Sequence, residues 1–212
     1  LGAIAAVVAV SVLLILHPWT DDESTTEPSA HIVSDDKPTG GNFVLTGTQG
    51  KLGLSNFSGK VVLLYFGYTT CPDICPTNLG NLASAMNQLT AEEQAKVQVL
   101  MITVDPERDD QTKMDVYLPY FHPSFKGLTG TPEQIAQVAK QYGAVYQKAA
   151  IGEGALGYAV DHSAFTYLIN QQGVLVTQLP HDTSGAEFVV AIRSLLKWPK
   201  HSKLKDSAYE IQ

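Results

Sequence analysis

The stretch from Val61 to Pro76 constrains the fold most, because it joins a predicted buried strand to a predicted helix through a pair of cysteines. It opens with the unbroken apolar run 61–66, which is typical of a strand buried on both faces of a parallel sheet. After the second cysteine, apolar residues recur at helical spacing: Leu79, Leu82, Met86 and Leu89. The two cysteines of the chain, Cys71 and Cys75, therefore lie at the edge of a sheet where α/β folds place their sites.

The spacing of Cys71 and Cys75 lets both side chains share one face of a helical turn. At the amino end of a helix, unpaired N–H groups and the helix dipole favour a thiolate over a thiol. We therefore expect the pair to hold a soft metal, to cycle between dithiol and disulfide, or to do both. A structural disulfide or two inert thiols is the alternative that the spacing leaves open.

The amino end of the chain has a different composition from the rest. Residues 1–16 carry no charge and a single polar side chain, Ser11, so we expect a transmembrane anchor, truncated at its amino end, over residues 1–19. A cleaved signal peptide is the alternative. The acidic residues that follow fit a domain outside the cytoplasm, because positive charge belongs on the cytoplasmic side. The expected parts after the anchor are a flexible linker over 20–41, a globular domain over 42–198 and a polar tail over 199–212.

Hydrophobic patterns predict alternating strands and helices in the globular domain. Expected strands are 61–67, 97–105, 164–169 and 174–179, and expected helices are 76–89, 112–121, 131–142 and 184–196, after a hairpin around Gly47–Gly50. Capping boxes, Thr131 with Gln134 and Ser184 with Glu187, mark the starts of two of these helices. This order predicts an α/β, thioredoxin-like fold, with a central mixed sheet and helices on both faces.

Topology also brings a histidine toward the cysteines. Strand 164–169 should run antiparallel to strand 61–67. His162, which comes just before strand 164–169, should therefore lie at the same edge of the sheet as Cys71, which comes just after strand 61–67. Two thiolates and an imidazole suit Cu(I) and, with a further ligand, Cu(II); Zn(II) accepts these donors but normally takes a fourth protein ligand. A hydrogen-bonding loop residue is the alternative for His162. Residues 149–160 are expected to form a mobile loop, and His122 an exposed loop residue.

Three separated motifs resemble those of the Sco (SenC) proteins: residues 65–76, residues 103–109, and Asp161-His162-Ser163. The resemblance covers roughly residues 42–198. It implies a membrane-anchored, thioredoxin-like copper protein that delivers copper to the binuclear centre of cytochrome c oxidase subunit II, with Cys71, Cys75 and His162 as the copper ligands. The role of Asp105–Asp109 stays open; helix capping and turn formation are its simplest roles.

The resemblance also implies partners and a location. Besides subunit II, it implies other copper chaperones and a thioredoxin-like reductant as partners. We expect a single-pass protein of the bacterial inner membrane, with its domain in the periplasm, rather than a mitochondrial one. The formal charge of −7 and the absence of a basic patch argue against a nucleic-acid partner.

Two functions remain open at this stage. The first is a metallochaperone for copper; the second is a thiol–disulfide oxidoreductase, with Cys71 and Cys75 as its redox pair, that keeps the oxidase cysteines reduced. Thioredoxins have two residues between their cysteines, whereas this chain has three. A peroxidase is a weaker option, because peroxiredoxins have Thr where this chain has Tyr68. His162 favours copper, since a reductase needs no imidazole there.

Overall fold

The computed structural model describes residues 38–150 and 157–197. By its internal contacts the chain divides between Asp35 and Asp36, and all described residues belong to the second unit. The expected anchor, most of the expected linker and the expected tail lie outside the described residues. Within the described ranges, no helix is both long enough and apolar enough to cross a membrane.

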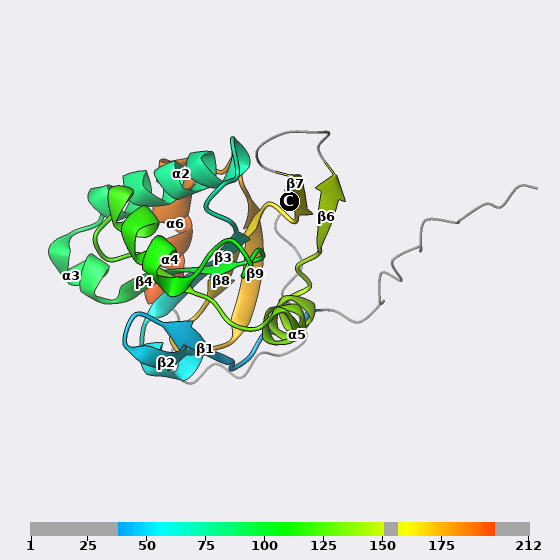
Figure 1. Ribbon diagram of the computed structural model, residues 1–212. Helices are drawn as coiled ribbons and strands as arrows, with labels where there is room; N and C mark the ends of the chain where they lie inside the picture. The colour runs from blue at the N-terminus through cyan, green and yellow to red at the C-terminus, as the bar shows by residue number, and fades with distance from the viewer. Residues whose placement is uncertain (1–37, 151–156, 198–212) are drawn as a thin grey trace, which may run out of the picture. The chain divides into compact units, whose positions relative to one another are not determined.

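A five-stranded mixed sheet forms the centre of the domain (Figure 1). Its strands, from edge to edge, are β5 (Lys126–Leu128), β4 (Val97–Thr103), β3 (Val61–Gly67), β8 (Phe165–Ile169) and β9 (Leu175–Pro180). The first three are parallel, and β8 and β9 run antiparallel to them. Every residue of β3 and β4 is buried, as the continuous apolar run of β3 and the mostly apolar sequence of β4 predict. The predicted mixed sheet is therefore confirmed, and β5 extends it beyond the prediction.

Helices cover both faces of this sheet, because neighbouring side chains of β3 point to opposite faces. Tyr65 reaches Cys75 of α2 (Ile74–Gln88), whereas the ring of Phe66 contacts Tyr142 of α5 (Pro132–Tyr142). Helix α6 (Gly185–Leu196) packs beside α2 (Figure 1). The remaining helices are α3 (Ala91–Ala95), α4 (Gln111–Tyr117) and two 3₁₀ turns, η1 (Leu54–Phe57) and η2 (Leu118–Tyr120).

The predicted helix starts at Thr131 and Ser184 are confirmed. Each side chain accepts a hydrogen bond from the backbone N–H three residues later, which completes a capping box. Helix α5 ends at Gly143, whose φ of 69° lies in the left-handed region that glycine adopts without strain. Helix α2 begins at Ile74, two residues before the predicted start, so Cys75 lies in its first turn.

The prediction of a mobile loop over residues 149–160 is wrong at both of its described ends. Residues Tyr146–Ala150 form β6 and residues Tyr158–His162 form β7, which pair as an antiparallel ribbon outside the central sheet (Figure 1). The six residues between 150 and 157 lie outside the described ranges. A second ribbon consists of β1 (Val44–Gly47) and β2 (Gly50–Gly53), which matches the predicted hairpin.

The described residues before Asn42 pack on α5, although their composition predicts a flexible linker. The backbone N–H of Gly40 donates to the carbonyl oxygen of Gln141 over 3.1 Å. The hydroxyl of Tyr142 donates to the carbonyl oxygen of Gly41 over 2.7 Å. These bonds join the start of the domain to the end of α5.

Candidate metal centre

The two cysteines lie at the junction of β3 and α2, as the sequence predicts. Cys71 belongs to the loop after β3, and Cys75 lies in the first turn of α2. The backbone N–H of Cys75 donates to Cys71 Sγ over 3.5 Å. Cys75 is fully buried, whereas Cys71 is partly exposed, and both are free thiols. An incoming molecule can therefore reach Cys71 before it reaches Cys75.

His162 completes the group from the end of β7. Its Nε2 lies 3.4 Å from Cys75 Sγ, and its Nδ1 lies 3.2 Å from the carbonyl oxygen of Ser163. A carbonyl oxygen only accepts hydrogen bonds, so Nδ1 carries the ring proton and Nε2 presents its lone pair to the sulfur. The rings of Tyr65 and Tyr68 pack edge-on against the imidazole, with centroids 6.0 and 5.8 Å away. The histidine thus has both its tautomer and its orientation set by its neighbours.

The structure brings together the three residues that the sequence analysis nominated as ligands. One donor atom from each of Cys71, Cys75 and His162 lies within 4.8 Å of the others, so a single ion can contact all three. Two sulfurs and one imidazole nitrogen form a soft donor set that suits Cu(I), and Zn(II) with a fourth ligand. The donor set therefore fits the predicted metal, and the ligand role of each residue stays a prediction.

The pKa values of the two thiols shift in opposite directions because the two groups share a hydrogen bond. The hydrogen bond from Cys75 lowers the pKa of Cys71 well below its ordinary value. The bond to Cys71 raises the pKa of Cys75, and burial raises it further. In the metal-free protein, Cys71 is therefore the thiolate and Cys75 the thiol. The partly exposed sulfur is the reactive one.

Tyr65 and Gly67 also shape the site, and the sequence analysis did not single them out. The buried hydroxyl of Tyr65 donates to Cys75 Sγ over 3.4 Å. Burial raises the pKa of this hydroxyl, so it keeps its proton and remains a donor. A Cβ atom at Gly67 would lie 2.9 Å from Cys75 Sγ and 2.6 Å from Tyr65 Cε1, so only glycine fits there. A glycine that ends a buried strand signals such a close approach.

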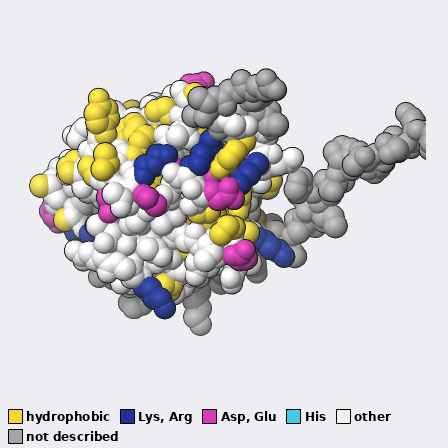
Figure 2. All heavy atoms as spheres, viewed as in Figure 1, with side chains coloured by type: hydrophobic (Ala, Val, Ile, Leu, Met, Phe, Trp, Pro, Cys, Tyr) yellow, Lys and Arg dark blue, Asp and Glu magenta, His cyan; other side chains and the backbone are white. Residues whose placement is uncertain are grey.

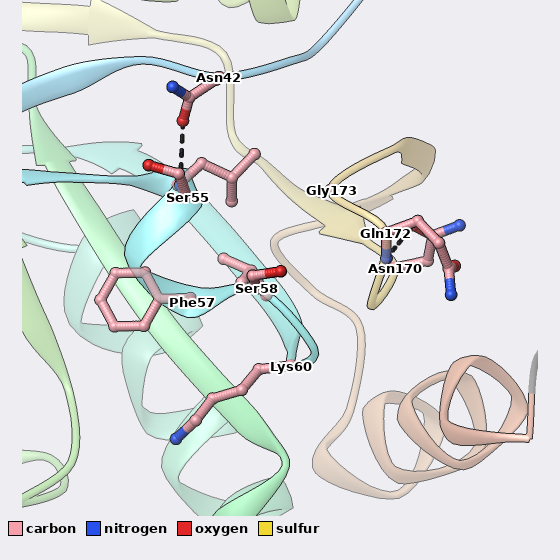
Figure 3. A pocket seen from close by; sticks show the side chains of 10 residues that line it. Asn42, Ser55, Phe57, Ser58, Lys60, Asn170, Gln172 and Gly173 are labelled. Atoms are coloured by element: carbon pink, nitrogen blue, oxygen red, sulfur yellow. Dashed lines mark hydrogen bonds between the residues drawn. The ribbon is translucent and has the colours of Figure 1, made fainter. Parts of the chain in front are cut away.

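Other features lie away from this group. A pocket of about 390 Å³ opens at the amino end of β3, opposite the end that the cysteines follow, and is lined by residues such as Asn42, Ser55, Lys60 and Gln172 (Figure 3). His122 is buried, with its Nδ1 2.8 Å from Ser124 Oγ, so the expectation that it is exposed is wrong. Lysine and arginine side chains lie beside acidic ones on the face shown in Figure 2.

Comparison with known proteins places the chain in a family. The SCO1/SenC family model matches residues 33–197. A SCO2-like protein of Rickettsia conorii is 32% identical over 90% of this chain and 93% of its own length. The solution structure of apo Sco1 from Thermus thermophilus is 42% identical, covers 76% of this chain and 93% of its own, and gives a TM-score of 0.69. Yeast Sco1 with copper bound is 32% identical, covers 82% of this chain and 99% of its own, and gives a TM-score of 0.70.

These matches agree with the geometry of the site and of the sheet. The structural neighbours align over nearly their whole length, so the predicted thioredoxin-like fold is confirmed. The family match spans β3, α2 and the strand that carries His162. On this combined evidence, the chain belongs to the SCO1/SenC family.

Proposed function

We propose that this protein binds copper and acts in the assembly of cytochrome c oxidase, where it delivers copper to the binuclear centre of subunit II. The observation that carries the proposal is that Cys71 Sγ, Cys75 Sγ and a ring nitrogen of His162 lie within 4.8 Å of one another. The copper-bound structure of yeast Sco1 supports the choice of metal. The family resemblance supports the choice of process and of recipient.

Release of the copper follows from the unequal exposure of its donors. An acceptor thiolate would approach on the side of Cys71 and His162, which are partly exposed, while Cys75 stays buried. As the new sulfur–copper bond forms, the neutral imidazole leaves first, since it carries no charge to neutralise. Further ligands of the acceptor would then displace the two thiolates, and the cysteine pair would take up a proton on Cys75. Copper changes ligands in these steps and does not change oxidation state.

The test is the substitution His162→Ala in the reduced protein, titrated with copper under anaerobic conditions. Two thiolates still hold Cu(I), so we expect Cu(I) affinity to fall without disappearing. Cu(II) prefers nitrogen and oxygen donors in a tetragonal field, so its affinity should fall much further. Optical and EPR spectra distinguish the two oxidation states. Equal Cu(II) affinity in the variant and the parent would remove His162 from the ligand set.

A second function, thiol–disulfide reductase, is favoured by the different states of the two sulfurs. The Cys71 thiolate would attack a disulfide of the oxidase subunit and release one of its sulfurs as a thiolate, which takes a proton. Cys75 would then lose its proton and attack Cys71, which releases the second thiol. The partner gains two electrons and two protons, and this protein is left with a Cys71–Cys75 disulfide. A thioredoxin-like reductant would restore the dithiol.

The two functions separate at His162, because disulfide exchange uses only sulfur. Cells that carry His162→Ala should lose oxidase activity at normal protein level if copper delivery is the function, and should keep it if thiol reduction is. Exchange of the Cys71–Cys75 disulfide with small thiols should be unchanged in the variant. Alkylation followed by mass spectrometry measures that exchange.

We further propose that the domain is anchored to the bacterial inner membrane and faces the periplasm. The apolar stretch 1–16 and the acidic residues after it support this placement. Other copper chaperones are the expected source of the metal. External protease should cleave the domain in spheroplasts, with a cytoplasmic protein as the protected control. Protection of the domain in intact spheroplasts would contradict the placement.

A further inference from the structure

The segment Asp105–Asp109 lies between β4 and α4, and its two aspartates are fully buried. From sequence alone its role is open, with helix capping and turn formation as the simplest roles. Capping of α4 belongs to the next residue, because the side chain of Asp110 accepts the hydrogen bond from the N–H of Lys113. The carboxylates of Asp105 and Asp109 instead reach two different parts of the candidate metal centre.

Asp109 holds the loop that carries Cys71. Its carboxylate accepts hydrogen bonds from the backbone N–H of Thr69 over 2.8 Å and from the hydroxyl of Thr69 over 2.5 Å. The hydroxyl of Thr103, the last residue of β4, donates to the same carboxylate over 2.9 Å. Lys113 Nζ lies 3.2 Å from it. Because Thr69 is two residues before Cys71, these bonds fix the start of the cysteine loop to the end of β4.

Asp105 holds the ribbon that carries His162. The hydroxyl of Tyr158 donates to Asp105 Oδ1 over 2.7 Å, and Arg108 Nε donates to the other carboxylate oxygen. Arg108 also donates to the carbonyl oxygen of Tyr158 over 3.0 Å, and its guanidinium lies 3.8 Å from the centre of the Tyr158 ring. Tyr158 is the first residue of β7 and His162 is the last. These bonds therefore fix one end of the strand whose other end presents the imidazole.

The buried hydrogen bonds to Asp105 hold the ribbon more strongly than the exposed ion pair between Lys148 and Glu107 does. Lys148 of β6 pairs with Glu107 over 2.6 Å, but both side chains are about half exposed, and such pairs contribute little. The bonds to Asp105 involve a carboxylate shielded from water, where charge-assisted hydrogen bonds are strong. Closer to the histidine, the N–H of Val160 donates over 3.4 Å to the hydroxyl of Tyr68, the residue that follows β3. The outer end of the ribbon thus depends on the segment 105–108.

We propose that Asp105–Asp109 is a positioning segment that fixes the cysteine loop through Asp109 and the His162 strand through Asp105 and Arg108. It sets the separation of the sulfur donors from the imidazole before any metal arrives. The proposal concerns the same site as the proposed function and rests on His162 being a copper ligand. Residues that orient metal ligands typically change metal affinity tenfold or more when they are replaced.

The test is Tyr158→Phe, which keeps the ring over Arg108 and removes the bond to Asp105. Cu(II) affinity should fall about tenfold, and Cu(I) affinity should change little, because Cu(I) relies mainly on the thiolates. The matched control is Tyr146→Phe. Tyr146 faces His162 across the ribbon, and its hydroxyl makes no hydrogen bond to any described residue. The control should bind both ions as the parent does.

A double-mutant cycle with His162→Ala separates positioning from general damage. If Tyr158 acts through the imidazole, Tyr158→Phe should have no further effect on Cu(II) affinity once His162 is alanine. An equal loss in both backgrounds, or no loss in the parent background, would overturn the proposal.

A metal-free measurement tests the docking by itself. In the copper-free full chain, amide hydrogen exchange at residues 160–162 should be faster in Tyr158→Phe than in Tyr146→Phe, while exchange in β3 should be equal. Unchanged exchange at 160–162 would overturn the positioning role whatever the outcome of copper binding. If exchange rises while His162→Ala binds Cu(II) as the parent does, the docking stands and the proposed ligand set fails.

Discussion

Replacement of Tyr65 by phenylalanine should weaken copper binding with little effect on the fold. The change removes one oxygen, which lies 3.4 Å from Cys75 Sγ in a fully buried position, and leaves the ring in place. In the copper-free protein Cys75 is a thiol, because its bond to Cys71 and burial raise its pKa. As a proposed copper ligand, Cys75 would become a thiolate when copper binds, and the hydrogen bond from Tyr65 would then have a charged acceptor.

The size of the effect follows from that change of acceptor. A hydrogen bond to a neutral group contributes about 0.5–1.5 kcal/mol and one to a charged group about 1.5–3 kcal/mol. The metal-bound state should therefore lose about 1–1.5 kcal/mol more than the metal-free state, which lowers the affinity about fivefold to twelvefold. The free energy of unfolding of the copper-free protein should fall by only about 0.5–1.5 kcal/mol.

The assay is competition for Cu(I) against a coloured chelator, with Tyr167→Phe as the matched control. Tyr167 is equally buried in the same sheet, and its hydroxyl has no hydrogen-bond partner among the described residues. Loss of that hydroxyl should leave Cu(I) affinity unchanged and should not destabilise the fold. If Tyr65→Phe and Tyr167→Phe bind Cu(I) equally tightly, the hydrogen bond to Cys75 does not stabilise the metal-bound thiolate.

Two further predictions concern stability. The hydrogen bond from Cys75 lowers the pKa of Cys71 in the folded protein below its ordinary 9.0. Below about pH 9 the unfolded chain therefore binds a proton at Cys71 that the folded protein does not, so the free energy of unfolding should rise with pH up to about 9. Above about pH 9 the free energy of unfolding should fall, because the pKa of Cys75 is raised in the folded state. Urea unfolding of the copper-free chain at a series of pH values measures both changes. The variant Cys71→Ser should lack the increase below about pH 9. Gly67→Ala should destabilise by about 1–3 kcal/mol because its Cβ meets Cys75 Sγ and Tyr65. Gly80→Ala, where an added Cβ meets nothing within 4 Å, should stabilise α2 by about 0.5–1 kcal/mol. Equal melting temperatures for the Gly67→Ala and Gly80→Ala variants would contradict both expectations.

Local chemistry explains which elements were predictable. The continuous apolar run of β3 and the mostly apolar sequence of β4 predict their burial, and capping boxes four residues long predict the starts of α5 and α6. Strand β5 has three residues and no pattern of its own, and it exists because it pairs with β4. The ribbon of β6 and β7 has polar and small residues that resemble a loop, and its hydrogen bonds to Asp105 and Arg108 form only after folding.

The residues of the candidate site also divide into those that the sequence predicts and those that it does not. Cys71 and Cys75 are close in sequence, and the order of the strands brings His162 to the same edge. The hydrogen bond from Tyr65 and the two carboxylates of Asp105 and Asp109 depend on side chains that meet only after folding. No spacing rule places Tyr158 against Asp105, because 53 positions separate them. The donor groups, which sequence proximity and strand order bring together, were therefore predictable, and the groups that orient them were not.

The placement of His162 on a ribbon outside the central sheet has an evolutionary consequence. The cysteines are attached to β3 and α2, whose side chains form the core, so substitutions around them endanger folding. The ribbon carries its histidine on mostly half-exposed residues, where substitutions are better tolerated. Metal affinity and preferred oxidation state can thus drift among related chains through changes in the ribbon, while the domain keeps its stability and its pair of sulfurs.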